Sequence, residues 1–138
     1  MPLISIVVPC YNEQESLPIF LKELDGVVHA MTQTHPDTSF EAVLIDDGSV
    51  DATLTVMKAE AASNHSYTIH WHSFSRNFGK EAALLAGLQH AKGDYVATMD
   101  ADMQDPPSLL PQMYEILQTE DYDNVATRRT TREGEPPI

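Results

Sequence analysis

The sequence of 138 residues has one cysteine, few basic residues and no long apolar run. A single thiol, Cys10, excludes an internal disulfide framework and suits a reducing compartment. No apolar run reaches the roughly 18 residues of a membrane-spanning helix. The first residues, MPLISIVVP, lack the basic lead of a signal peptide. The sequence is therefore typical of a globular domain.

Basic residues are scarce in comparison with acidic ones. Eight Lys and Arg stand against 21 Asp and Glu, which gives a formal net charge of −13 at pH 7. This balance argues against sequence-independent binding to nucleic acid, and against attachment of this segment alone to an anionic membrane. If the substrate is anionic, a cation must therefore mediate its binding.

Short apolar segments alternate with segments of helical periodicity. Apolar and β-branched residues predict four strands over residues 3–9, 40–47, 67–74 and 94–100, and a weaker fifth over 122–127. Helical spacing predicts helices over residues 13–32, 49–63, 79–91 and 106–118. Ser49 or Asp51 is the expected N-cap of the second helix, and proline at residue 106 suits the first turn of the fourth.

This alternation predicts the fold class. We expect an α/β domain with a doubly wound, mostly parallel sheet, strand order 3-2-1-4 and helices on both faces. The length fits one domain. Residues 128–138 are polar, with no apolar periodicity. We interpret residues 1–127 as a nucleotide-binding half-domain and 128–138 as the start of a further region that the chain does not include.

Polar residues collect directly after each of the four main strands. Ligands of open parallel sheets bind beyond the carboxyl ends of the strands, so these residues form the candidate site. A stable sheet does not need polar tips on all four strands. The residues are Pro9, Tyr11, Asn12 and Glu13, then Asp46, Asp47, Gly48 and Ser49, then Arg76, Asn77, Gly79 and Lys80, and finally Asp100, Asp102, Gln104 and Asp105.

Three carboxylates crowd into the stretch TMDADMQDPP, residues 98–107. Like charges this close repel, so a compensating cation is expected. Asp105 precedes a proline and is typical of a turn or a cap. Asp100 and Asp102 can face one cation. Ligation by oxygen alone suits Mg²⁺ or Mn²⁺, with substrate phosphates completing the coordination shell.

Each motif also has a purely structural explanation. DDGS at 46–49 is typical of a turn followed by an N-cap. Tyr11 alone would fit a half-buried aromatic residue. Arg76 and Lys80 alone would fit solvated surface charges. The coincidence of the four motifs at one sheet edge, rather than any single motif, therefore indicates a site.

The histidines and the cysteine give weaker signals. The six histidines have no acidic or Cys partner at metal-ligand spacing. His70 and His72 share one face of a predicted strand and could bind a metal, but we favour structural or surface roles for them. We interpret Cys10 as a small buried residue rather than a nucleophile.

The four motifs together resemble the family 2 glycosyltransferases in order and spacing. They read VVPCYNE, IDDGSVDAT, SRNFGKEAALLAGL and DADMQDPP. Within that family the chain looks most like the polyprenyl-phosphate glycosyltransferases, the group of dolichol-phosphate mannose synthases and bactoprenol glucosyltransferases. The resemblance covers nearly the whole chain. It implies a GT-A fold, a divalent metal, Mg²⁺ or Mn²⁺, and inversion at the anomeric carbon.

The resemblance implies roles for the residues after the first two strands. Pro9, Tyr11 and Glu13 would cradle the nucleotide base and ribose. Asp46 or Asp47 would bond the base, and Asp47 continues the DDGS pattern.

It also implies roles for the acidic stretch. Asp100 and Asp102 match the family's DXD motif, with Asp102 as the main metal ligand and Asp100 as a sugar or ribose contact near the metal. Asp105 is grouped with them as a catalytic residue. Gln104 extends the motif to DADxQDPP, which favours the polyprenyl-phosphate branch.

The resemblance finally implies a reaction. We expect a metal-dependent transferase that moves a hexose from a UDP- or GDP-sugar to a polyprenyl phosphate at the cytoplasmic membrane face, with Arg76 and Lys80 near the donor pyrophosphate or the acceptor phosphate. Family members continue into acceptor-side loops, amphipathic helices and often membrane spans. The base of many relatives lies in that later part, so no base is named.

Two alternatives remain open from the sequence. One is a soluble family 2 transferase that makes polysaccharide or glycan. The other is a non-catalytic nucleotide-binding module. Membrane contact would come through a later C-terminal region, and an open sheet edge near residues 122–127 would favour self-association.

Overall fold

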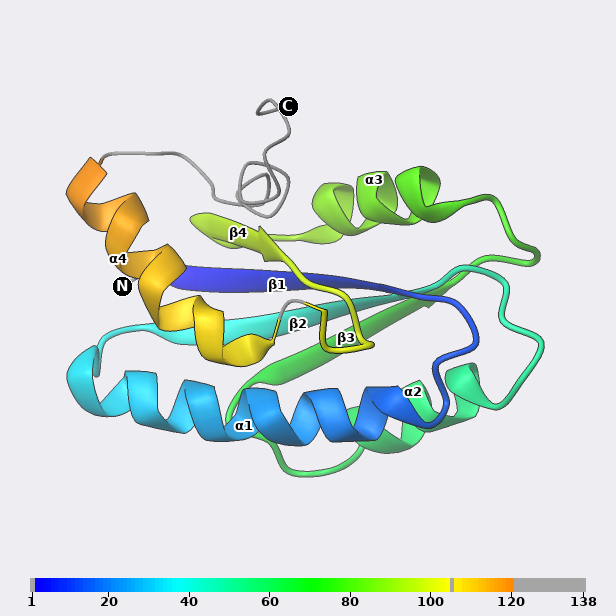
Figure 1. Ribbon diagram of the computed structural model, residues 1–138, viewed down its shortest axis with the longest axis horizontal. Helices are drawn as coiled ribbons and strands as arrows, with labels where there is room; N and C mark the ends of the chain where they lie inside the picture. The colour runs from blue at the N-terminus through cyan, green and yellow to red at the C-terminus, as the bar shows by residue number, and fades with distance from the viewer. Residues whose placement is uncertain (1, 105, 121–138) are drawn as a thin grey trace.

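The computed structural model describes residues 2–104 and 106–120 of the chain. The predicted fifth strand at 122–127 and the polar tail lie outside these residues. Four parallel strands form one sheet in the order β3-β2-β1-β4 (Figure 1). Their bounds are β1 Leu3–Cys10, β2 Ser39–Asp46, β3 Thr68–Ser73 and β4 Tyr95–Thr98. The predicted order 3-2-1-4 is confirmed.

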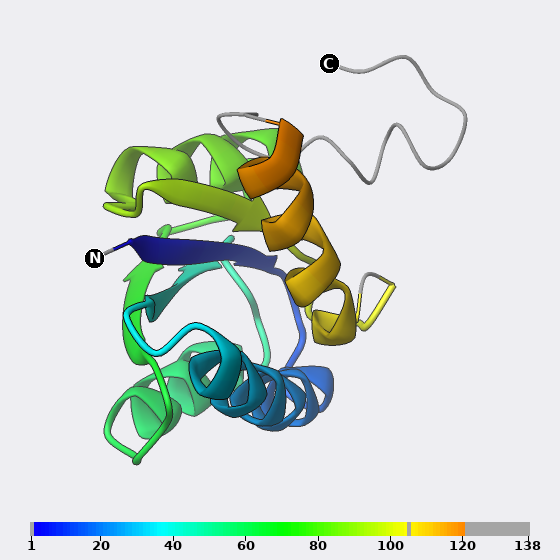
Figure 2. The ribbon, with the colours of Figure 1, turned by 90° about the vertical axis from the view of Figure 1, so that its left-hand side faces the viewer.

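Helices connect the strands and cover both faces of the sheet. Figure 2 shows α3 on one face, with α1 and α2 on the other and α4 beside β4. No helix within the described ranges combines the length and apolarity needed to cross a bilayer. The helices are α1 Ser16–Thr34, α2 Thr53–Ala61, α3 Lys80–His90 and α4 Leu110–Glu120, and the 3₁₀ turn η1 Pro107–Leu109 precedes α4.

The second helix begins later than predicted. Ala52 occupies its cap position, so the expectation that Ser49 or Asp51 would be the N-cap is wrong. Asp51 Oδ1 still accepts a hydrogen bond from the N–H of Thr53, at 2.9 Å. Residues 49–52 instead bond to the loop after β1, which draws them out of the helix.

Alternation along the central strands supplies two cores. On β1, Ile4, Ile6 and Val8 face the larger core, which α1 and α4 complete, whereas Val7 faces the smaller core beneath α3. Burial of both faces explains why β1 and β2 read as nearly continuous apolar runs.

Helix α3 lies unusually close to β1. A Cβ atom on Gly87 would stand 2.2 Å from Cγ1 of Val7, so no larger residue fits at this position without a shift. Ala83, one turn earlier, is also fully buried. Small residues on this face therefore set the depth at which α3 packs on the sheet.

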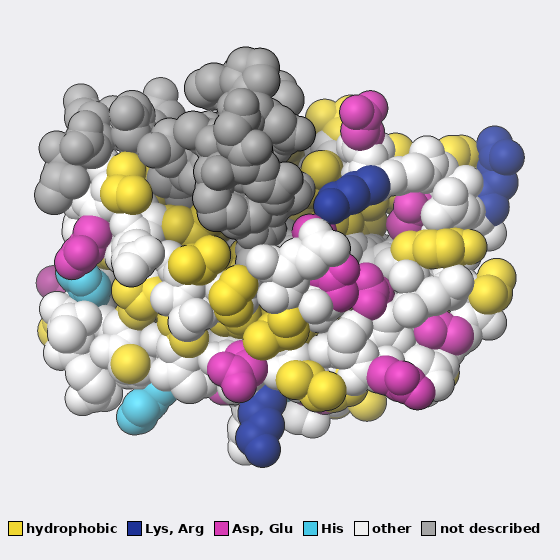
Figure 3. All heavy atoms as spheres, in the orientation of Figure 1, with side chains coloured by type: hydrophobic (Ala, Val, Ile, Leu, Met, Phe, Trp, Pro, Cys, Tyr) yellow, Lys and Arg dark blue, Asp and Glu magenta, His cyan; other side chains and the backbone are white. Residues whose placement is uncertain are grey.

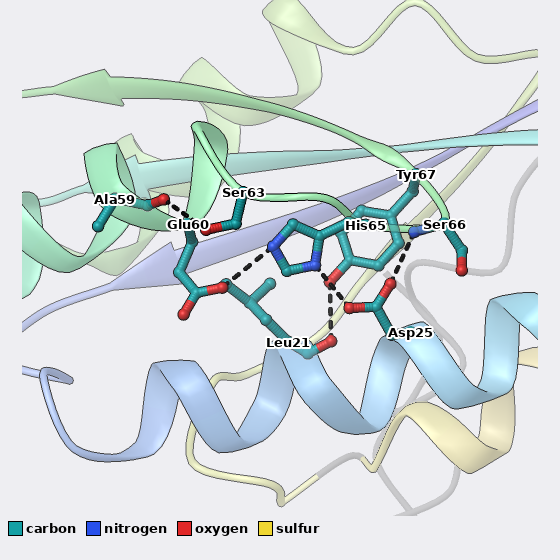
Figure 4. Close-up of polar contacts among 8 residues, drawn as sticks. All are labelled: Leu21, Asp25, Ala59, Glu60, Ser63, His65, Ser66 and Tyr67. Carbon is teal, nitrogen blue, oxygen red and sulfur yellow. Dashed lines mark hydrogen bonds and ion pairs between the residues drawn. The ribbon is translucent and has the colours of Figure 1, made fainter.

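A buried histidine links α1, α2 and the segment before β3. His65 Nδ1 lies 2.5 Å from Asp25 Oδ2 on α1, and Nε2 lies 3.1 Å from Glu60 Oε1 on α2 (Figure 4). The imidazole stacks on Tyr67, whose hydroxyl donates to the carbonyl of Leu21. The His65 side chain is 8% exposed, so both contacts are largely shielded from water.

We predict that His65→Ala lowers the free energy of unfolding by about 2–3 kcal/mol, because it leaves a cavity and two facing carboxylates with no group between them. Urea denaturation monitored by circular dichroism measures the change. His29→Ala, which removes an exposed imidazole from α1, serves as the control. Equal stability of the two variants would contradict the prediction.

Three histidines gather near the edge strand β3. The rings of His72 and His90 stack with centroids 3.6 Å apart, and His70 Nε2 lies 3.5 Å from Glu41 Oε1. Among residues 2–104 and 106–120, no group of three or more His, Cys, Asp or Glu side chains is placed to hold a metal. Burial, and then the neighbouring His90 and His70, lower the pKa of His72.

This lowered pKa predicts a loss of stability in mild acid. The folded state binds the His72 proton less readily than the unfolded state, whose histidine pKa is about 6.5. The folded state therefore loses relative stability as the pH falls below that value. We expect His90→Gln, which removes one repelling neighbour, to reduce the loss between pH 7.5 and 5.5. Urea titrations at both pH values test this, and an unchanged pH dependence would refute it.

Candidate active site

The loops after the four strands meet at the carboxyl edge of the sheet and enclose a cavity of about 190 Å³. Eight of the eleven residues to which the resemblance assigns a role line it, together with Cys10. Figure 3 shows acidic side chains gathered beside a basic one on this part of the surface. The lining residues are Pro9, Cys10, Tyr11, Glu13, Asp47, Lys80, Asp100, Asp102 and Gln104.

Of the other three, Asp46 and Arg76 do not line the cavity. Asp46 is buried, and its carboxylate accepts hydrogen bonds from Ser49 N and Ser73 Oγ, both at 3.0 Å. The Arg76 guanidinium stacks over the ring of Phe78, 4.5 Å from its centroid. Asp105 lies outside the described residues. Asp46 therefore supports the loop after β2, and any role of Arg76 toward a ligand stays a prediction.

Asp47 joins the loop after β2 to the loop after β3. Its Oδ1 accepts from Phe78 N at 2.8 Å, and its Oδ2 accepts from Gly79 N and Asn77 Nδ2 at 3.1 Å. Three donors on one buried carboxylate fix the start of α3. Because both oxygens already accept bonds, any direct contact of Asp47 with a nucleotide base would add to this framework.

A glycine allows these two loops to approach each other. Gly48 has φ +70°, and a Cβ there would stand 2.1 Å from the carbonyl carbon of Arg76. Both the left-handed backbone and the close contact favour glycine. The glycine of the DDGS motif is thus required by a contact with the loop after β3, and the turn-forming composition of the motif does not reveal this contact.

The loop after β1 is held by side chains to which the family resemblance assigned no role. Asn12 has φ +54°; its N–H donates to Ser49 Oγ and its Oδ1 accepts from Val50 N, each at 2.9 Å. The N–H of Glu13 donates to Thr53 Oγ1 at 2.8 Å. These bonds turn the chain sharply after β1 and place residues 11 and 13 on the cavity wall. Asn12 could have been singled out from the sequence, because asparagine adopts the left-handed backbone region more readily than most residues.

Lys80 and Asp100 form an ion pair at the centre of the site. Lys80 Nζ lies 2.8 Å from Asp100 Oδ1. Asp100 is 8% exposed, and its Oδ2 is buried with no hydrogen-bond partner among the described residues. Asp102 is exposed, and its Oδ1 accepts from Gln104 N at 3.1 Å. Asp100 thus has one oxygen paired with Lys80 and one that no described residue contacts by a hydrogen bond.

The cavity offers oxygen ligands that suit a hard dication. Four carboxylates line it, those of Glu13, Asp47, Asp100 and Asp102, against the one ammonium of Lys80. Carboxylate oxygen, including the unpartnered Asp100 Oδ2, is the ligand type that Mg²⁺ and Mn²⁺ prefer. Mg²⁺ usually takes only one or two carboxylates and completes its shell with phosphate and water. Because no three such side chains among the described residues are placed to hold a metal together, Asp100 and Asp102 fit an ion that takes most of its ligands from phosphate and water.

Cys10 lines the same cavity without nucleophilic character. Burial raises the pKa of its thiol, and Glu13, Asp46 and Asp100 raise it further. The thiol donates toward the carbonyl of Val8 at 3.5 Å. The interpretation of Cys10 as a small buried residue agrees with its 1% exposure.

Known sequences and structures resemble the chain over most of its length. Residues 5–137 match glycosyl transferase family 2. The undecaprenyl-phosphate 4-deoxy-4-formamido-L-arabinose transferase of Sodalis glossinidius is 41% identical over 130 residues, which cover 94% of this chain and 38% of that protein. The namesake protein of Photorhabdus laumondii is 37% identical over 132 residues, with the same coverage. The chain thus spans about two fifths of the length of these relatives.

Solved structures show the same fold. The mannosyltransferase PcManGT of Pyrobaculum calidifontis, solved with GDP-Man and Mn²⁺, superposes with a TM-score of 0.69 at 24% identity, covering 84% of this chain and 32% of that one. TarS of S. aureus superposes with a TM-score of 0.66 at 21% identity, covering 88% of this chain and 20% of that one. The sheet order agrees with the predicted GT-A fold, and the chain belongs to glycosyl transferase family 2.

Proposed function

We propose that this chain forms the donor-binding part of a glycosyltransferase that moves a sugar from a nucleoside diphosphate sugar to a polyprenyl phosphate. One observation carries the proposal: the four family motifs converge on a single acidic cavity at the carboxyl edge of the sheet. The names of the relatives, undecaprenyl-phosphate transferases, support the class of acceptor.

The walls of the cavity suggest how the donor lies. Pro9, Tyr11 and Glu13 form the side that would hold the base and ribose, and Asp47 lies at the adjoining wall. Tyr11 is 46% exposed, so its ring is available to stack on a base. The sugar and diphosphate would then lie over the end of β4, near Asp100.

Asp102 and Asp100 are the residues that would hold Mg²⁺ or Mn²⁺. Asp102 is exposed beside the cavity, and Asp100 Oδ2 is the acceptor without a partner among the described residues. A bound dication would supply Lewis-acid stabilisation of the leaving diphosphate. The chain's own contribution is to hold Asp102 through the bond that its Oδ1 accepts from Gln104 N, and to hold Asp100 in the free protein through its ion pair with Lys80.

The acceptor needs little activation. A phosphate monoester carries at least one ionised oxygen at neutral pH, so attack on the anomeric carbon does not require a strong base. In this proposal the reaction takes place at the cytoplasmic membrane face, and the acceptor is bound by residues outside this chain. The donor sugar is a hexose by the sequence resemblance and a formamido-arabinose by the names of the relatives, so both classes should be assayed.

Nucleotide binding should depend on a divalent cation, because the acidic cavity repels a bare diphosphate. We expect UDP or GDP to bind in Mn²⁺, and Asp102→Asn to weaken that binding at least about tenfold. Isothermal titration calorimetry with and without EDTA measures both effects. Asp37→Asn, which removes an exposed carboxylate from the turn before β2, is the control. Equal affinity in EDTA would overturn the metal role.

This chain should bind the donor nucleotide without catalysing efficient sugar transfer. Transfer requires both substrates to be aligned, and losing that alignment can remove about 7 kcal/mol or more of the rate advantage. We expect the 138-residue chain to bind nucleotide yet transfer little radiolabelled sugar to a short polyprenyl phosphate, whereas the full-length relative from Sodalis glossinidius turns over its own donor. Robust transfer by the chain alone would show that the acceptor groups already lie within it.

A further inference from the structure

The ion pair between Lys80 and Asp100 occupies an oxygen that a metal would be expected to use. Lys80 is the first residue of α3 and reaches across the cavity to Asp100, which follows β4. Its side chain is 50% exposed, so the ammonium can leave the carboxylate without disturbing the core. Asp100 is 8% exposed and cannot turn to water in the same way.

The charges around the pair make Lys80 the local substitute for a cation. Among the residues that line the cavity, Lys80 is the one basic side chain beside four carboxylates. An unpaired carboxylate at this depth would be costly, so the free protein gains from keeping the ammonium there. The same ammonium opposes a second cation that approaches Asp100.

We propose that Lys80 is an exchangeable counter-ion, which neutralises Asp100 in the free protein and turns to the donor's diphosphate when a dication takes its place. This inference rests on the proposed function, since it needs a diphosphate and a dication in the same cavity. Lys80 acts here as a positioning residue for Asp100 and as a contact for the donor.

The exchange couples the two ligands. A dication that arrives alone must displace the ammonium and leave it without a partner. A dication that arrives with a diphosphate gives the ammonium a new anionic partner. Metal and nucleotide should therefore bind with positive cooperativity, and the coupling should be reciprocal. A lysine that served only as a diphosphate ligand would strengthen nucleotide binding without weakening the binding of metal alone.

The test compares Lys80→Met with the wild-type chain in two measurements. Mn²⁺ alone is titrated and free Mn²⁺ is counted by electron paramagnetic resonance. UDP and GDP are then titrated at saturating Mn²⁺ by calorimetry. We expect the variant to bind Mn²⁺ alone about tenfold more tightly and the Mn²⁺–nucleotide pair more weakly, within the usual range of coupling between sites. The two changes have opposite signs.

The test includes one control variant and one substitute variant. Lys92→Met removes the same charge just beyond the other end of α3, where the residue is exposed, and should change neither affinity. Lys80→Gln, which can still hydrogen-bond Asp100, replaces Lys80→Met if that variant does not fold by circular dichroism.

The outcomes separate the two hypotheses. If the wild-type chain binds neither nucleotide in Mn²⁺, the proposed function fails. If it binds one of them but the Lys80 variants bind Mn²⁺ alone no more tightly than the wild type, or Lys92→Met has an equal effect, the exchange is refuted while the proposed function stands.

Discussion

The contact between Gly87 and Val7 sets the geometry on which the cavity depends. Gly87 packs on Val7 with no space for a Cβ atom, which fixes α3 against the central strand β1. Val7 also pairs with Thr98 in the parallel register of β1 and β4. Lys80 lies seven residues before Gly87, about 10 Å along the helix axis, and Asp100 lies two residues after Thr98. The positions of Lys80 and Asp100 therefore both depend on Val7, one through α3 and the other through β4.

Buried carboxylates hold the loops at the end of the sheet and so shape the cavity. Asp47 binds three donors from residues 77–79, and Asp46 binds the loop beside it. Each carboxylate satisfies backbone N–H groups that a sharp turn would otherwise leave without partners. The two aspartates of the DDGS motif thus have a structural role, which is to hold the loops after β2 and β3. This explains how a motif can be both typical of a turn and part of the cavity wall.

Sequence patterns were sufficient for the sheet order and for most of the residues that line the cavity, but not for Cys10 or for the contacts within the cavity. Strand–helix alternation predicts the sheet order, and the sheet order brings the strand-end motifs together. The start of α2, the left-handed backbone of Asn12 and the Lys80–Asp100 pair depend on residues 20 to 40 positions apart. No local periodicity encodes such pairings. Asp46 and Asp47 look equivalent in sequence and both are buried, yet only Asp47, the first residue after β2, lines the cavity.

The excess of acid at the cavity follows from the charge of the ligand it is proposed to hold. A basic cavity would bind a diphosphate directly, but it would also bind inorganic phosphate and other nucleotides without a metal. Four carboxylates and one lysine reverse this preference, since a bare anion meets net repulsion and an anion with a dication does not. The burial of Asp100 strengthens the effect, because charge interactions are stronger where water is excluded. In this proposal the carboxylates select the metal-bound donor, and Lys80 offsets their charge when no donor is bound.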